Sequence, residues 1–233
     1  MRILDIGCGP GTITMDLARL VPDGEVIGLD PEPTVIDQAR RAAVTGNLKN
    51  VKFEVGNVYA LNHPDSKFDV VHGHQILQHV GQPVDALREM RRVLKLGGIL
   101  ACRESDFSVN SWFPESIGIQ SFQDLYMRVA RSNGGDPTAG RKLHAWASEA
   151  GFDWKHIQSS ASTWCFSTLE EREYWGGMWA ARLLHSDLVQ QATNGGHATQ
   201  DDLLEMSQAW QDWILNPAGR FVFQHGEVLC RKE

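Results

Sequence analysis

Apolar residues in the first hundred positions come in short runs separated by longer amphipathic stretches. The runs RILDI, VIGLD, VKFEV, FDVVHG and ILAC predict strands at residues 2–6, 26–30, 51–55, 68–73 and 99–102. Helical spacing of apolar residues begins near Ile13, Thr34 and Pro83, and Gly97-Gly98 is expected to cap the third of these helices. Strands that alternate with helices predict a parallel sheet covered on both faces.

After Asp106 the pattern becomes mainly helical. Helices are predicted at 119–131, from about 138 to 151, from Thr168 with an interruption at Gly176-Gly177, and around 203–213, with a loop at 193–199. The chain is expected to form a single domain with a core at 1–106 and helical cover insertions at 107–150 and 167–214. The final strands are expected at 152–166 and 220–231.

Composition limits the classes of partner. The chain has 233 residues, 42% hydrophobic residues and a formal net charge of -7, with no clustered basic face. This favours a soluble protein and argues against nucleic acid or anionic lipid as the main partner. No segment approaches the ~20 apolar residues of a membrane span, and the start lacks the build of a signal peptide, so a cytoplasmic location is expected.

The stretch LDIGCGPGT, residues 4–12, places glycine at positions 7, 9 and 11 directly after the first strand. Glycine lets the backbone approach a ligand closely, and this turn lies at the carboxyl edge of a doubly wound sheet, where ligands bind. The dinucleotide fingerprint would need a third glycine at position 12, where Thr12 stands. G-x-G-x-G preceded by the acid Asp5 is instead the signature of proteins that bind S-adenosyl-L-methionine (SAM).

Five segments in unbroken order carry a wider resemblance. LDIGCGPGT resembles motif I of the class I SAM-dependent methyltransferases, and GLDP, VGNVYAL, FDVVHGHQILQHV and VLKLGGIL resemble the motifs around their second to fifth strands. Within that family the chain is similar to the small-molecule, quinone-biosynthesis-like (methyltransferase type 11) group. The resemblance implies an α/β, doubly wound, Rossmann-like and mostly parallel seven-stranded sheet, of order 3-2-1-4-5-7-6, with an antiparallel last strand. Family members generally carry a helical segment before motif I, so a more open site is expected here.

The same resemblance implies a set of cofactor-binding residues for SAM and its product, S-adenosyl-L-homocysteine (SAH). Asp30 is expected to accept hydrogen bonds from the ribose hydroxyls, and Asn57 replaces the usual aspartate near the adenine amino group. The implied set is Asp5, Gly7, Gly9, Gly11, Thr12, Asp30, Pro31, Gly56, Asn57, Val58 and His74.

Methyl transfer from SAM is an in-line displacement, and an acceptor of high pKa also needs a base. Candidate bases at the carboxyl ends of the fourth and fifth strands are His74, His79, Glu104 and Asp106, of which His79 is preferred. The alternative for His79 is a polar cap or a core histidine. Glu104 and Asp106 either serve the substrate site or end their strand in solvent.

Tryptophan is abundant, with eight residues in the chain. Trp112, Trp164, Trp175 and Trp179 are expected either to form an aromatic wall for a flat or cationic acceptor or to pack in the core. His72, His74 and His79 are the possible metal ligands, but no metal is expected, because no carboxylate or cysteine completes a ligand set with them.

Three functions stay open from the sequence. The first is SAM-dependent methyl transfer to a small organic acceptor. The second is a non-catalytic methyltransferase-like protein that binds SAM or SAH, and the third is an NAD(P)-dependent oxidoreductase. The helical cover is also compatible with a homodimer.

Overall fold

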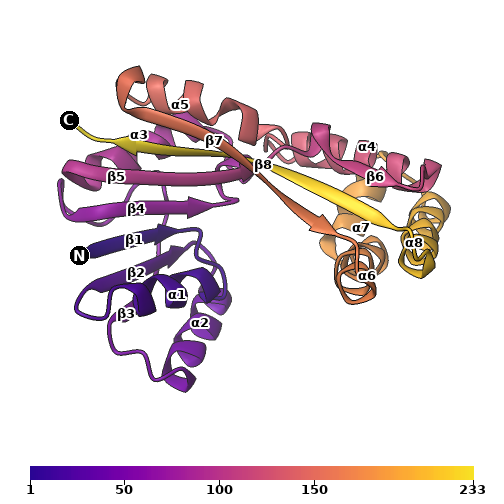
Figure 1. Cartoon of the computed structure of the whole chain (residues 1–233), viewed down its shortest axis with the longest axis horizontal. Helices are drawn as coiled ribbons and strands as arrows, with labels where there is room; N and C mark the ends of the chain where they lie inside the picture. The colour runs from indigo at the N-terminus through magenta and orange to yellow at the C-terminus, as the bar shows by residue number, and fades with distance from the viewer. The chain divides into compact units, whose positions relative to one another are not determined.

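The computed structural model describes all residues, Met1–Glu233, and separates them into two compact units (Figure 1). Unit 1 comprises Met1–Glu104, Ala139–Ala161 and Gly226–Glu233, and unit 2 comprises Ser105–Thr138 and Ser162–His225. The chain therefore passes between the units several times. That the two units act as one domain stays a prediction.

The strands of the sheet are β1 (Arg2–Ile6), β2 (Glu25–Asp30), β3 (Val51–Val55), β4 (Phe68–His74), β5 (Leu94–Ser105), β6 (Ser111–Phe113), β7 (Ile157–Phe166) and β8 (Arg220–Arg231). Their order is β3-β2-β1-β4-β5-β8-β6, and β7 also pairs with β8. The neighbours from β3 to β5 are parallel.

The direction of β8 follows from its hydrogen bonds with β5. The N–H of Gly97 donates to the carbonyl of Lys232, and the N–H of Lys232 donates to the carbonyl of Gly98, so the start of β5 meets the end of β8. The two strands are therefore antiparallel. Since β7 and β8 are the predicted sixth and seventh strands, the predicted order is confirmed. The short strand β6 is an addition to it, inside a segment predicted as helical cover.

The α-helices are α1 (Thr12–Leu20), α2 (Pro33–Thr45), α3 (Pro83–Val93), α4 (Ile117–Ser132), α5 (Leu143–Glu149), α6 (Leu169–His185), α7 (Asp187–Asn194) and α8 (Gln200–Leu215). Short 3-10 helices are η1 (Leu77–His79), η2 (Phe107–Val109), η3 (Ala139–Lys142) and η4 (Trp154–His156). None of these helices combines the length and apolar composition that a membrane crossing requires.

The core of unit 1 follows from the alternation of side chains along its strands. Leu4 of β1 lies on the face that packs with Leu87 and Met90 of α3, whereas Ile3 packs on the other face with Ala18 of α1. All of these side chains are buried. Burial of each large aliphatic side chain stabilises the fold by about 1.5–3 kcal/mol, so both sheet faces hold the carboxyl edge in place.

Two predicted boundaries in unit 1 were wrong. The segment 139–150 was predicted as part of the cover, but Leu143 and Ala147 of α5 pack into the core beside α3, and the segment belongs to unit 1. The pair Gly97-Gly98 was predicted to cap a helix. Instead α3 ends at Val93, and both glycines lie in the irregular start of β5, where Gly97 has a φ of 76° and the pairing with β4 shifts register.

Unit 2 has a largely aromatic core built by α4, α6, α8 and the strand residues Phe221 and Phe223. The helix α6 runs through Gly176-Gly177, so the predicted interruption there was wrong. A Cβ on Gly176 would lie 2.7 Å from Cγ1 of Ile214 in α8, so the missing side chain permits close packing of two helices. The helix α7 was not predicted, and it takes up the first two residues of the predicted loop at 193–199.

Candidate functional site

The glycine loop, residues 7–11, joins β1 to α1 at the carboxyl edge of the sheet. Gly7, Gly9 and Gly11 all have left-handed φ values, of 67°, 53° and 84°. A Cβ on Gly11 would lie 2.6 Å from the ring of Phe53, whereas a Cβ on Gly9 would meet no protein atom within 4 Å. Gly11 is therefore required by packing, and Gly9 exposes bare backbone to open space, as a ligand cradle needs.

Asp30 ends β2 beside this loop. Its Oδ2 accepts a hydrogen bond of 3.1 Å from the N–H of Gly9, and its Oδ1 accepts one of 3.1 Å from the N–H of Glu32. The carboxylate thus fixes the loop while it stays partly exposed. A carboxylate offers about four acceptor sites, so both oxygens can still accept from hydroxyl groups. Pro31, the next residue, is exposed.

The predicted adenine side follows β3. The N–H of Gly56 donates to the carbonyl of Asp30 over 3.1 Å, which ties this turn to the end of β2. Oδ1 of Asn57 accepts from the N–H of Tyr59 over 2.9 Å. The side chain of Val58 packs in the core of unit 1. The amide nitrogen of Asn57 and the backbone of this turn are therefore the groups that the segment offers to a ligand.

Arg92 of α3 anchors the segment after that turn, a role that its position in a predicted helix did not reveal. Its guanidinium donates to the carbonyls of Leu61 and His63 over 2.9 and 2.8 Å, and it pairs with the carboxylates of Asp65 and Glu89. These bonds hold the loop between β3 and β4 against α3.

Asp5 lies beneath the glycine loop and is 2% exposed. Its Oδ2 accepts a hydrogen bond of 2.5 Å from Oγ1 of Thr14, and its Oδ1 lies 2.7 Å from Nδ1 of His72. The carboxylate of Asp5 therefore contacts Thr14 and His72 inside the protein and offers little surface to a ligand. Thr12 begins α1 and is exposed.

Cys8 lies between the first two glycines and is buried. Burial raises the pKa of its thiol to about 12, with further contributions from the negative charges of Asp5 and Asp30. The thiol is therefore neutral across the physiological range.

His74 ends β4 and is partly buried. The pKa of His74 is lowered to about 4, mainly by burial and in part by the charges of Arg103 and His72. The imidazole is therefore neutral at physiological pH and suited to hydrogen bonding rather than to pairing with an anion.

Glu104 ends its strand inside the protein and is 0% exposed. Its carboxylate accepts hydrogen bonds from the N–H groups of Ile76, Leu77 and Gln78 over 3.0, 2.8 and 3.2 Å. The pKa of Glu104 is raised to about 7, because the effect of burial outweighs the lowering by these three donors. The expectation of a substrate contact at Glu104, or of a strand end in solvent, was wrong, because the carboxylate caps the turn after β4.

That turn also supports the glycine loop. A Cβ on Gly7 would lie 3.1 Å from Ile76, so the two segments are already in close contact. Asp106, the other predicted acid, is 3% exposed and accepts from the N–H and hydroxyl of Ser108. A solvent position for Asp106 was therefore also wrong.

His79 lies at the end of η1, where its N–H donates to the carbonyl of Ile76 over 2.9 Å. Its Nε2 lies 3.1 Å from Nε2 of Gln78. Burial of part of the ring lowers the pKa of His79, but the residue as a whole is exposed, which limits that effect. His79 is therefore not a core histidine, and its role as a base stays a prediction.

The predicted tryptophan wall is only partly present. Trp175 is 6% exposed and stacks on Phe166, with ring centroids 4.4 Å apart, in the core of unit 2. Trp179 packs in the same core. A substrate role for Trp175 was therefore wrong, because aromatic packing covers it.

Trp112 and Trp164 keep exposed surface. Trp112 stacks on Phe221 and lines a groove of about 640 Å³ between β6 and the start of α4. Trp164 lies 4.5 Å from the ring of His225. These two tryptophans remain predicted substrate contacts.

No group of three or more His, Cys, Asp or Glu side chains is arranged to hold a metal ion. The histidine that the sequence offered only as a possible metal ligand, His72, is instead paired with Asp5. One feature of the sequence could have indicated this pairing. His72 lies on the fourth predicted strand, two positions before His74, and that strand was expected beside the strand of Asp5.

Comparison with known proteins agrees with this geometry. Residues 1–163 match a family model described as a methyltransferase domain. The chain is 37% identical over 238 residues to an uncharacterized methyltransferase of Schizosaccharomyces pombe, across 100% of this chain and 84% of the relative. It is 30% identical over 245 residues to a probable methyltransferase of Aspergillus luteorubrus, across 99% and 85%.

Solved structures show the same fold. A phosphoethanolamine N-methyltransferase of Haemonchus contortus, in complex with phosphomonomethylethanolamine and SAH, superposes with a TM-score of 0.62 at 17% identity. The match covers 100% of this chain and 49% of that protein.

Proposed function

Because the chain belongs to the class I SAM-dependent methyltransferases, we propose that it transfers the methyl group of SAM to a small organic acceptor. SAM supplies an electrophilic methyl group on a sulfonium, and SAH leaves when the acceptor has taken that group. The protein's share of the work is to hold both reactants in line, which contributes about 7–11 kcal/mol in favourable cases.

The observation that carries the proposal is the pairing of the glycine loop with Asp30. Gly9 opens onto free space, and its N–H is fixed by the carboxylate of Asp30. An adenosyl ligand along this edge would place its ribose hydroxyls at Asp30 and its adenine near Asn57. Bare backbone at residues 7–11 leaves room for the amino acid end.

A small acceptor is supported by charge. The net charge of -7 disfavours a polyanionic substrate such as nucleic acid. The last three residues of β4 and the residue after it read HGHQ, whereas DNA and RNA amino-methyltransferases usually carry an Asn/Asp-Pro-Pro-Tyr/Phe motif in the corresponding place. A homodimer and a cytoplasmic location stay predictions from the sequence.

Calorimetric titration with SAH tests the cofactor site. Micromolar binding is expected for the wild type, and Asp30→Ala is expected to weaken it by about 10- to 100-fold, since hydrogen bonds to a charged group contribute about 1.5–3 kcal/mol. Asp16→Ala is the matched control, because Asp16 is an exposed acid of α1 that pairs only with Arg19. Equal losses in the two variants, or no binding by the wild type, would contradict the proposed site.

Turnover is tested with methyl-labelled SAM and a fractionated metabolite extract. Labelled product in a small-molecule fraction is the expected result. If SAH binds and no product forms, the protein is a SAM-binding protein without methyl transfer, and the proposed reaction is wrong.

A further inference from the structure

Asp5 and His72 form a pair across two adjacent parallel strands. They are register partners on β1 and β4, so their side chains project from the same face of the sheet. Oδ1 of Asp5 lies 2.7 Å from Nδ1 of His72, and Oδ2 accepts the hydroxyl of Thr14 over 2.5 Å. Both oxygens of Asp5 are thus engaged, and the carboxylate cannot rotate away from the histidine.

The pairing fixes the tautomer of His72. A carboxylate only accepts hydrogen bonds, so Nδ1 of the ring carries the hydrogen in this pair. In the neutral imidazole, Nε2 then keeps its lone pair. The structure gives Nε2 no hydrogen-bond partner and does not bury it, and the side chain of His72 is 20% exposed against 3% for Asp5. The free nitrogen is therefore open to a proton donor.

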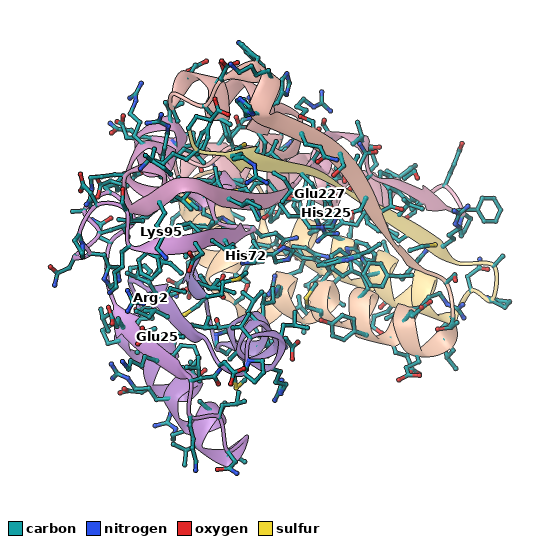
Figure 2. All side chains as sticks on the ribbon, turned by 60° about the vertical axis from the view of Figure 1, so that its left-hand side comes forward. Arg2, Glu25, His72, Lys95, His225 and Glu227 are labelled. Atoms are coloured by element: carbon teal, nitrogen blue, oxygen red, sulfur yellow. The ribbon has the colours of Figure 1, made fainter.

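His72 also lies at the functional edge of the sheet. Its neighbour Gly73 pairs with Ile6, the residue directly before the glycine loop. Figure 2 labels Arg2, Glu25 and Lys95 toward one end of the strands and His72 toward the other. Arg2 and Glu25 begin β1 and β2, and Lys95 is the second residue of β5, so His72 is on the carboxyl side.

We propose that His72, oriented by Asp5, is the general base of methyl transfer; this inference rests on the proposed function. Nε2 of His72 takes the proton from the X–H group of the acceptor. The electron pair of X forms the bond to the methyl carbon, and the carbon–sulfur bond of SAM breaks with its pair going to sulfur. The products are X–CH3, SAH and a protonated His72 that faces Asp5, and the proton then passes to solvent.

The other candidates at this edge are less suited. The carboxylate of Glu104 already accepts hydrogen bonds from three N–H groups of the turn after β4. His74, whose pKa is lowered to about 4, is a weak base. His79 has Gln78 as its hydrogen-bond neighbour and no carboxylate to stabilise its protonated ring. Only His72 has the orienting acid that a base of this kind uses.

The charged and titratable groups around His72 come from several elements. Asp5 on β1 contacts Nδ1 of His72, and His74 lies two residues further along β4. Arg103 on β5 acts on the neighbouring His74. Cys8, whose thiol pKa is about 12, and the uncharged Thr14 add no charge at neutral pH. A base of this kind produces an acidic limb in the pH–rate profile, because protonation of His72 removes its free lone pair.

The experiment compares His72→Gln with His144→Gln, a substitution at an exposed histidine of α5. Each variant is assayed with methyl-labelled SAM, using the metabolite extract and a panel of phenols, thiols and amines. His72→Gln is expected to lower the turnover rate by about 100- to 10,000-fold and to remove the acidic limb. SAH affinity, measured by calorimetry, is expected to stay within threefold, which also reports that the variant is folded.

Asp5→Asn supplies a second variant, since it keeps the shape of the side chain and replaces one acceptor oxygen by an NH2 donor, which can donate to Nδ1 of His72 and so favour the other tautomer. Nitrogen-15 NMR of the histidine rings is expected to show the Nδ1–H form of His72 in the wild type and its loss in Asp5→Asn.

Several outcomes would overturn the assignment. His72 is not the general base if His72→Gln keeps full turnover or if His144→Gln loses as much turnover. A dominant Nε2–H tautomer at His72 would exclude this role as well. Loss of the acidic limb in His79→Gln, with the limb retained in His72→Gln, transfers the role to His79. A wild type that binds SAH and methylates nothing removes the proposed function as well, whereas a failure confined to His72→Gln and its pH profile leaves that function intact.

Discussion

The carboxyl edge of unit 1 and the core of unit 2 bury their polar atoms in opposite ways. At the edge, the carboxylates of Asp5 and Glu104 are buried with a partner for each oxygen. In unit 2 the indole nitrogens of Trp175, Trp179 and Trp210 are buried with no partner in the protein. An unpaired buried donor costs about 1–3 kcal/mol, so the aromatic core is built for apolar area and the edge for polar geometry.

This difference separates the residues that serve chemistry from those that serve stability. The indole rings of unit 2 contact one another and nearby phenylalanines, as in the pair Phe122 and Trp210, whose centroids lie 5.3 Å apart. Substitutions there are expected to change the free energy of unfolding most. Substitutions at the edge of unit 1 are expected to change ligand binding and pH dependence as well.

The largest effect is expected for Trp210→Ala. Trp210 is 0% exposed, and its removal leaves a cavity in unit 2 that lowers the free energy of unfolding by about 3–5 kcal/mol. Urea denaturation measures the change. Trp154→Ala is the control, because Trp154 is 59% exposed and should cost less than about 1 kcal/mol. Similar losses in both variants would contradict an aromatic core centred on Trp210.

Glu104→Gln is expected to change the pH dependence of stability. The pKa of Glu104 is about 7 in the fold against 4.5 in the unfolded chain, so the folded protein holds the proton more tightly. This group's contribution to stability is therefore present below pH 4.5 and is lost as the pH rises to 7. The loss is on the order of 3 kcal/mol, from 1.36 kcal/mol for each pKa unit.

The measurement is urea denaturation of the wild type and Glu104→Gln from pH 5 to 8. The stability of the wild type relative to the variant should fall with rising pH. A difference that stays constant across this range would show that Glu104 does not titrate there.

A smaller effect is expected for Gly11→Ala. The left-handed φ of 84° costs alanine about 1–2 kcal/mol, and its Cβ would also press on Phe53. Both the melting temperature and the SAH affinity should fall. Retained affinity would mean that the loop tolerates a side chain where the proposed cradle requires none.

The smallest effect is expected for Gly177→Ala in α6. A Cβ there meets no protein atom within 4 Å, and alanine favours a helix over glycine by about 0.5–1 kcal/mol, so stability should rise by this amount. Gly176→Ala is the matched opposite, since its Cβ would lie 2.7 Å from Ile214. Thermal denaturation of the pair tests whether packing with α8 explains only one of the two glycines.

Much of unit 1 was predictable from local pattern. The alternation of apolar residues in VKFEV predicted a strand at 51–55, and β3 spans Val51–Val55. The spacing of the glycines predicted the turn between β1 and α1. The sheet order came from the family resemblance rather than from any single strand. Local signals suffice for elements whose apolar periodicity and turn residues agree.

The contacts of the site were less predictable, because they join residues far apart in the chain. Glu104 reads like a strand end, but its carboxylate meets the turn at 76–78 across the sheet. From the sequence, His72 is a candidate metal ligand. Its role as the partner of Asp5 is apparent only when β4 lies beside β1. Trp175 has helical spacing whether it lines a pocket or a core, so only its packing distinguishes the two.

The buried thiol of Cys8 has a chemical consequence for a loop that would hold an alkylating reagent. A cysteine attacks electrophiles as the thiolate, and a pKa of about 12 leaves almost none of that form at neutral pH. Negative charge from Asp5 and Asp30, the same side chains that shape the loop, thus helps to prevent self-alkylation. The protein protects its own sulfur from the sulfonium while leaving the acceptor free to react.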